Sequence, residues 1–82
     1  MATYSVVTLP AVEQKIRTIP FPIRRHLVHA LVRLQQNPRP EGSRPIELDV
    51  YRLNLHGWRV VYVIDDDELQ VTVVRVAESA TG

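Results

Sequence analysis

Apolar side chains recur at two periods along this chain, first at a helical spacing and later at the alternation of strands. Val12 and Ile16 lie four residues apart, which predicts a short helix. Pro20 and Pro22 end that helix, because proline cannot continue the helical hydrogen-bond ladder. A longer amphipathic helix is predicted from about residue 22 to residue 36, on the apolar residues Ile23, Leu27, Ala30, Leu31 and Leu34.

Strands are predicted on both sides of this helical region. The β-branched run at residues 4–7 predicts the first. After Gly42 the alternating pattern predicts three more, at residues 49–55, 58–64 and 69–76. His56 and Gly57 have the length of a two-residue hairpin turn, and residues 65–68 form the next turn. The prediction is one α+β domain over residues 1–82, in the order β-α-α-β-β-β. Two N-terminal helices would cover one face of a mostly antiparallel four-stranded sheet.

Alternation across the predicted hairpin sorts its side chains onto two faces. The apolar face, expected to pack against the helices, holds the pairs Leu55 with Trp58, Leu53 with Val60, and Tyr51 with Tyr62. The same register puts Arg75 on this face, where it would stack on Trp58. The other face is open and carries Arg52, Asn54, Arg59, Gln70, Thr72 and Val74.

Composition narrows the class of protein further. The 82 residues include no cysteine, and neither a signal peptide nor a membrane-length apolar run is visible, so the cytoplasm is the expected compartment. The net charge is +1, but nine of the ten basic residues are arginine and nine of the ten precede residue 65. Arginine suits bidentate contacts with phosphate or carboxylate. No pattern calls for a metal or another cofactor.

Two interpretations of the open face remain at this point. Arginines on a sheet face can follow an RNA backbone without reading its sequence. Alternatively, the face is polar because one side of an antiparallel sheet is commonly solvated. Histidines 26 and 29 favour a surface pair over a metal site, since no third ligand is evident. His56 could act as a general acid or base, or have no role beyond the turn.

Three segments resemble toxins of the RelE/ParE superfamily. Residues 31–42, Leu-Val-Arg-Leu-Gln-Gln-Asn-Pro-Arg-Pro-Glu-Gly, resemble the end of the second helix of those toxins. Tyr51-Arg52-Leu53 and the run at residues 57–67, Gly-Trp-Arg-Val-Val-Tyr-Val-Ile-Asp-Asp-Asp, resemble their signature hairpin. Residues 71–76 resemble their last strand, so the similarity covers nearly the whole chain in the right order.

The resemblance implies the toxin of a microbial type II toxin–antitoxin system, partnered by a cognate antitoxin. RelE-like members cut mRNA on the ribosome by activating a ribose 2′-hydroxyl, and ParE-like members act on DNA gyrase. An mRNA endonuclease is therefore the first expectation. The alternative is a non-enzymatic binding module, either a ParE-like gyrase inhibitor or a toxin that only binds an antitoxin.

The site residues implied by the resemblance lie on the predicted hairpin and just before it. Arg59 matches the arginine that stabilises phosphate charge in the transition state, and Arg52 matches a basic position on the preceding strand. Asn54 stands where a second basic residue is common, and Arg44 is a further candidate for RNA binding. His56 is the candidate proton-transfer residue. The family's basic stretch and tyrosine after the last strand are missing from residues 77–82, which implies attenuated RNA cleavage.

Overall fold

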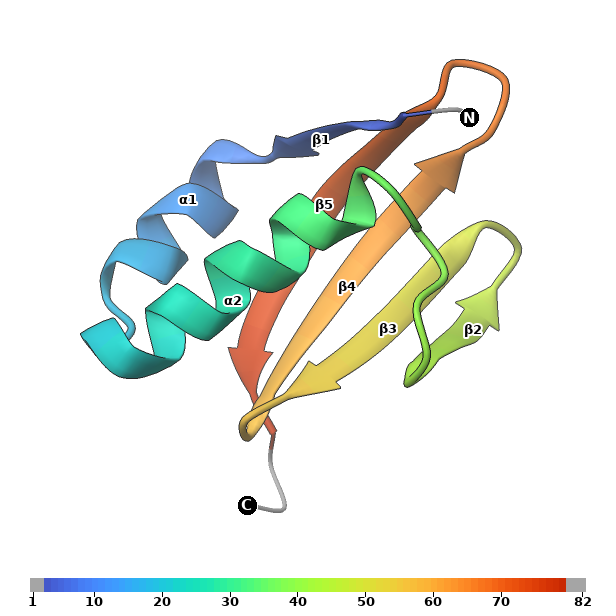
Figure 1. Cartoon of the computed structure of the whole chain (residues 1–82). Coiled ribbons are helices and arrows are strands. Elements are labelled where there is room, and N and C mark those ends of the chain that lie inside the picture. The colour runs from blue at the N-terminus through green and yellow to red at the C-terminus, as the bar shows by residue number, and fades with distance from the viewer. Residues whose placement is uncertain (1–2, 80–82) are drawn as a thin grey trace.

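A computed structural model describes residues 3–79 and has two helices and a five-stranded sheet. The helices lie on one face of the sheet (Figure 1). The elements follow the order β1 (Ser5–Thr8), α1 (Pro10–Arg17), α2 (Phe21–Leu34), β2 (Ser43–Glu47), β3 (Val50–Leu55), β4 (Trp58–Asp65) and β5 (Gln70–Glu78). The α+β layout and the two helices are confirmed. No helix within residues 3–79 is long and apolar enough to cross a membrane.

The sheet differs from the predicted one in strand number and direction. Its order is β1-β5-β4-β3-β2, and β1 runs parallel to β5, so the sheet has five strands and is mixed. The missed strand is β2, which pairs antiparallel with β3 at the edge. It contains Pro45, which has no backbone N–H to donate. An edge strand tolerates proline because one side of the strand faces solvent and needs no donor there.

Prolines set where both helices begin. Pro10 is the first residue of α1, and Pro22 lies in the first turn of α2. Proline is favoured there because its missing N–H would have no intrahelical partner in the first turn. The main core lies between α2 and the facing side of the sheet, and its fully buried side chains are Leu27, Leu34, Val60, Tyr62, Ile64, Val71 and Val73.

The hairpin between β3 and β4 has the register that the sequence predicts. Leu55 pairs with Trp58, Leu53 with Val60, and Tyr51 with Tyr62. His56 and Gly57 form the turn with positive φ angles of 51° and 81°. Two positive φ angles are what a type I′ turn needs, and this turn matches the twist of the strands that it joins.

Candidate functional site

Four arginines lie on the face of the sheet that the helices leave open. Arg44 of β2 pairs with Arg52 of β3, and Arg52 pairs in turn with Val61 of β4. Arg75 of β5 pairs with Val61 from the other side, and Arg59 lies two residues before Val61 on the same strand. We call Arg44, Arg52, Arg59 and Arg75 the arginine face. Asn54 pairs with Arg59 and therefore lies beside it.

The place of Arg75 corrects the sequence prediction, which had put this residue on the helix-covered face beside Trp58. Between Val61 and Tyr62 the register with β5 shifts by one residue, and Val74 is the extra residue of the resulting β-bulge. The bulge reverses the alternation after Val73, so Arg75 faces outward and is exposed. The cation over the Trp58 ring is instead Lys15 of α1, whose Nζ lies 5.9 Å from the ring centroid.

The same bulge changes where Glu78 lies. Glu78 pairs with Trp58, a residue of the helix-covered face, so its side chain is in phase with that face. Without the bulge, alternation would have put this carboxylate beside the arginines. The register shift thus brings a positive charge onto the open face and takes a negative one off it.

No carboxylate among residues 3–79 forms an ion pair with the arginine face. Within residues 3–79 the ion pair that forms joins Arg39 to Asp66, at some remove from these four side chains. The Nε atoms of Arg52 and Arg59 are buried and have no hydrogen-bond partner in the described part of the chain. Four like charges on neighbouring strands repel one another, and an anion bound above them would relieve that repulsion.

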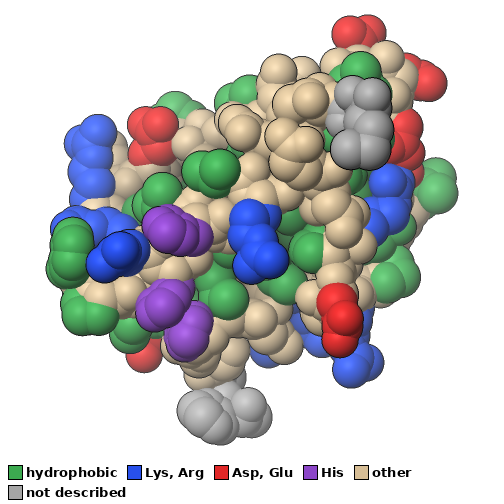
Figure 2. All heavy atoms as spheres, viewed as in Figure 1, with side chains coloured by type: hydrophobic (Ala, Val, Ile, Leu, Met, Phe, Trp, Pro, Cys, Tyr) green, Lys and Arg blue, Asp and Glu red, His purple; other side chains and the backbone are tan. Residues whose placement is uncertain are grey.

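Negative charge gathers at the opposite end of the sheet, around the turn between β4 and β5 (Figure 2). Asp65 ends β4, and its Oδ1 accepts hydrogen bonds from the backbone N–H groups of Asp67 and Glu68 at 3.1 and 3.0 Å. Charge therefore varies along the strands: Arg59 lies toward the β3–β4 turn, the other three arginines are level with the middle of β4, and carboxylates gather at the β4–β5 turn. A polyanion is attracted to the arginines and repelled by the acidic turn.

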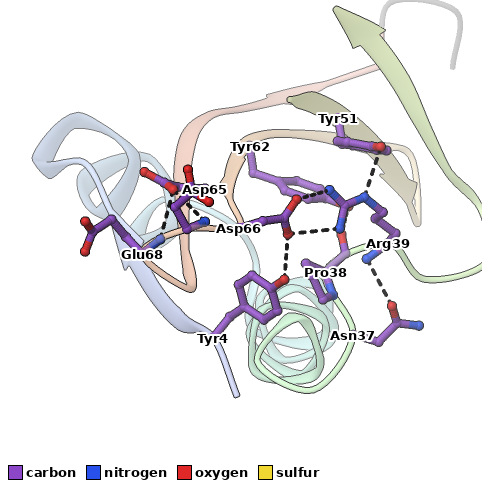
Figure 3. A network of polar contacts seen from close by, with 10 residues as sticks. Tyr4, Asn37, Pro38, Arg39, Tyr51, Tyr62, Asp65, Asp66 and Glu68 are labelled. Carbon is purple, nitrogen blue, oxygen red and sulfur yellow. Dashed lines mark hydrogen bonds and ion pairs between the residues drawn. The ribbon is translucent and has the colours of Figure 1, made fainter. Parts of the chain in front are cut away.

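The acidic turn has a structural partner in Arg39, which follows α2 (Figure 3). Its guanidinium makes a bidentate contact with the carboxylate of Asp66 at 2.9 and 3.3 Å, and its Nε donates to the Tyr51 hydroxyl at 3.1 Å. Tyr4 donates to the same carboxylate at 2.6 Å. Hydrogen bonds from Arg39 and Tyr4 hold the pKa of Asp66 below its ordinary value. This network ties the β4–β5 turn to the start of the chain and to the loop after α2.

His56, the candidate proton-transfer residue, lies away from the arginine face, and so do the two tyrosines of the hairpin. Tyr51 and Tyr62 are on the helix-covered side, where the buried Tyr62 hydroxyl donates to the Pro38 carbonyl at 2.8 Å. His56 stacks on His26 of α2, with ring centroids 4.1 Å apart. The structure therefore brings Arg44, Arg52, Asn54 and Arg59 together but does not bring His56 to them. Its catalytic role stays a prediction.

The other histidines lie on the helix side of the molecule, where Figure 2 shows the imidazoles close together. His26 and His29 are both exposed on α2. No group of three or more histidine or acidic side chains within residues 3–79 is arranged to hold a metal ion.

A groove of about 430 Å³ opens on the helix side, between the end of α2 and β3. Its lining is mostly apolar and includes Ala30, Leu53 and Leu55, with Arg33 and Glu41 at its polar margin. Val28 and Val32, on the outward side of α2, are 44% and 55% exposed. The helix side therefore offers apolar surface that a partner could cover, while the open side of the sheet offers charge.

Solved structures of RelE toxins share this fold. The archaeal RelE–RelB complex from Pyrococcus horikoshii matches with a TM-score of 0.86 at 18% identity, covering 98% of this chain and 99% of that one. The RelBE2 toxin–antitoxin complex from Mycobacterium tuberculosis matches at 0.81 and 20% identity, covering 94% and 99%. The isolated E. coli RelE toxin matches at 0.81 and 25% identity, covering 93% and 84%. The fold is thus that of the RelE/ParE toxin superfamily.

The family itself is identified from the sequence. Residues 8–81 match the ParE toxin of the type II toxin–antitoxin system, parDE, and the chain belongs to this family. It is the toxin component of such a system. No curated protein matches the chain. The resemblance that the hairpin and helix-end motifs indicated is confirmed.

Proposed function

We propose that this toxin acts on RNA at the ribosome and holds the RNA backbone on its arginine face. The observation that carries the proposal is the gathering of Arg44, Arg52, Arg59 and Arg75 on one open sheet surface, with no ion pair to a carboxylate in the described part of the chain. Guanidinium groups bind phosphate oxygens in a bidentate manner, and such contacts hold a nucleic-acid backbone without reading its bases. In this proposal the toxin acts in the cytoplasm, where ribosomes are found.

Arg59 is the residue we assign to the reacting phosphate. It lies between Asn54 and Ala77 on the central strand β4, with its Nε already shielded from water. A guanidinium fixed in this way stabilises the negative charge that develops on phosphate as the 2′-oxygen attacks. Arg52, diagonally opposite on β3, supports the same phosphate.

Cleavage also needs a base for the 2′-hydroxyl and an acid for the leaving oxygen. No histidine or tyrosine among residues 3–79 lies on the arginine face, and the neutral polar side chain beside Arg59 is Asn54. The loss of one proton-transfer group lowers a rate by about 10²–10⁴. We therefore propose an attenuated mRNA endonuclease, in which phosphate binding is stronger than the chemistry.

A gyrase-directed function is the second candidate, and the match to the ParE family favours it. In that case the toxin would be a non-enzymatic binding module. The lack of a histidine or tyrosine on the arginine face within residues 3–79 would then have no consequence for function.

An antitoxin is the proposed protein partner. RelE is seen bound to RelB in the archaeal complex and in the E. coli RelBE complex, which matches this chain at 25% identity. In this toxin the apolar groove beside α2 and the unpaired edge of β2 are the surfaces that a folding antitoxin segment could cover. Thermal melting with the product of the adjacent gene tests this proposal, and a melting temperature unchanged at saturation would contradict it.

The decisive experiment compares mRNA cleavage on programmed ribosomes with inhibition of gyrase supercoiling. We expect slow cleavage by the unmodified toxin, slower by about 10² in Arg59→Gln because one charge-stabilising group is lost. Arg25→Gln is the matched control, since Arg25 is an exposed arginine of α2 on the other side of the sheet. Gyrase inhibition without ribosome binding would replace the RNA function with the second candidate. Rapid cleavage would show that proton-transfer groups do operate at Arg59.

A further inference from the structure

The β-bulge of β5 adds a charge to the open face that simple alternation would have placed elsewhere. Val73 is fully buried and Val76 is 5% exposed, although their positions differ by three in sequence. Regular alternation cannot bury both, because residues an odd number apart point to opposite faces. The extra residue Val74 absorbs the difference, and Arg75 lies on the open face as a result.

Arg75 then completes a row across four strands. Arg44, Arg52, Val61 and Arg75 are successive cross-strand partners on β2, β3, β4 and β5. Neighbouring strands are about 4.8 Å apart, so the Cα atoms of Arg52 and Arg75 lie roughly 10 Å apart on either side of Val61. Arg59 is diagonal to both, at roughly 7–8 Å, and lies toward the β3–β4 turn.

The number of charges on this row decides what kind of ligand fits it. A phosphodiester carries one negative charge, whereas the arginine face carries four positive charges that no carboxylate of residues 3–79 pairs with. One phosphate held by Arg52 and Arg59 would leave Arg44 and Arg75 uncompensated. Arg75 is exposed, while Arg52 and Arg59 are half-buried, so its guanidinium can reach a ligand that lies higher above the sheet.

We propose that Arg75 binds a second phosphate of the same RNA strand, next to the one held by Arg52 and Arg59. The bound segment is single-stranded, has at least two consecutive phosphates, and crosses the strands of the sheet. Val61, between the arginines, gives it an apolar surface against which a ribose or base can pack. This inference rests on the proposed RNA function. It adds a phosphate contact by Arg75, a residue that the register predicted from the sequence placed on the other face of the sheet.

The test uses two oligoribonucleotides, a dinucleoside monophosphate with one phosphate and a tetranucleotide with three. Affinities are measured by NMR titration across a salt series for the unmodified toxin, Arg75→Gln, Arg75→Lys, Arg59→Gln and the control Arg25→Gln. We expect Arg75→Gln to weaken tetranucleotide binding about tenfold, the size of one lost charge-assisted hydrogen bond. Its salt slope should fall by about 0.7, the value for one phosphate contact on a single strand.

The other measurements distinguish failure of the Arg75 inference from failure of the proposed RNA function. The dinucleotide should be bound equally by Arg75→Gln and the unmodified toxin, and Arg75→Lys should keep the salt slope because it keeps the charge. Equal losses for both oligonucleotides would overturn the inference, since Arg75 would then share the first phosphate. An effect of Arg59→Gln without one of Arg75→Gln would overturn it too, leaving the RNA function intact. No effect of either variant would contradict the RNA function itself. Far-UV circular dichroism checks that each variant is folded.

Discussion

Substitution of Tyr62 by phenylalanine tests how the sheet holds the loop that follows α2. Tyr62 is fully buried, and its hydroxyl donates to the carbonyl of Pro38 at 2.8 Å. Phenylalanine keeps the packed ring but leaves this carbonyl buried without a donor, which costs about 1–3 kcal/mol. A domain of 82 residues has a total stability of roughly 4–12 kcal/mol. The variant should therefore lose a measurable fraction of it and melt roughly 5–15 °C lower.

The measurement is urea and thermal unfolding followed by the fluorescence of Trp58, the single and buried tryptophan of the chain. Tyr51→Phe is the matched control. The Tyr51 hydroxyl accepts a hydrogen bond from the exposed Arg39, so its loss should cost less than about 0.5 kcal/mol. The reasoning fails if Tyr62→Phe is no more destabilising than Tyr51→Phe, because the Pro38 carbonyl would then have another partner.

The pH dependence of stability, compared between the unmodified toxin and Tyr62→Phe, gives an independent check. Burial raises the pKa of Tyr62 above its ordinary value of 10.0. The stability that comes from keeping this phenol neutral is therefore full below pH 10 and is lost as the pH rises toward the folded-state pKa. Between pH 9 and 11 the free energy of unfolding should fall less for Tyr62→Phe than for the unmodified toxin. The difference should correspond to the ionisation of one phenol.

Three further substitutions probe the turn, the ion pair and the core. Gly57→Ala should cost about 1 kcal/mol through backbone strain alone, because φ is +81° and an added Cβ has no atom within 4 Å; thermal melting measures it, and an unchanged midpoint would show that the turn needs no left-handed residue. Asp66→Asn should flatten the loss of stability on acidification. The depressed pKa of Asp66 means that its pairing with Arg39 stabilises above pH 3.8 and is lost as the pH falls through the lower folded-state pKa; urea titrations from pH 5 to 2 compare the two proteins, and parallel curves would refute it. Leu27→Ala should cost about 2–5 kcal/mol because Leu27 is 1% exposed, and a cost under 1 kcal/mol would mean that the core closes over the cavity.

The hairpin at His56 and Gly57 could be predicted from the sequence because its determinants are local. The length of the turn fixes which residues are opposite one another, and the apolar residues on both strands agree with that register. Arg52, Asn54 and Arg59 follow directly from it. The part of the candidate site that lies on these two strands was therefore accessible without a structure.

The edge strand β2 and the parallel pairing of β1 were not accessible in this way. Most side chains of β2 are exposed, Pro45 interrupts its donors, and no alternation marks it as a strand. Its formation depends on the free edge of β3, which is a property of the folded sheet. The direction of β1 beside β5 likewise depends on how the two helices return the chain, and no local pattern records that.

The bulge did leave a trace in the sequence. Val71 and Val73 alternate, but Val74 follows directly, and the next buried residue is Val76. An unbroken alternation would have buried the charged Arg75 and exposed the apolar Val76, which is unfavourable for both. Valine is common throughout this strand, so the apolar pattern alone did not indicate the register shift. Arg39 and Asp66, by contrast, are 27 residues apart and meet only through tertiary structure.

The energies of the two alternatives explain why the bulge forms. A guanidinium forced into the helix-covered face beside the buried Val60 and Val73 would have to be desolvated, at an effective cost of several kcal/mol. A bulge disturbs the ladder at one position, and one hydrogen bond contributes only about 1 kcal/mol net. The register shift is thus favoured by the burial of Val76 and the hydration of Arg75, before any ligand is considered. The fourth charge of the arginine face follows from packing the core, and the oligonucleotide titrations decide whether the toxin uses it.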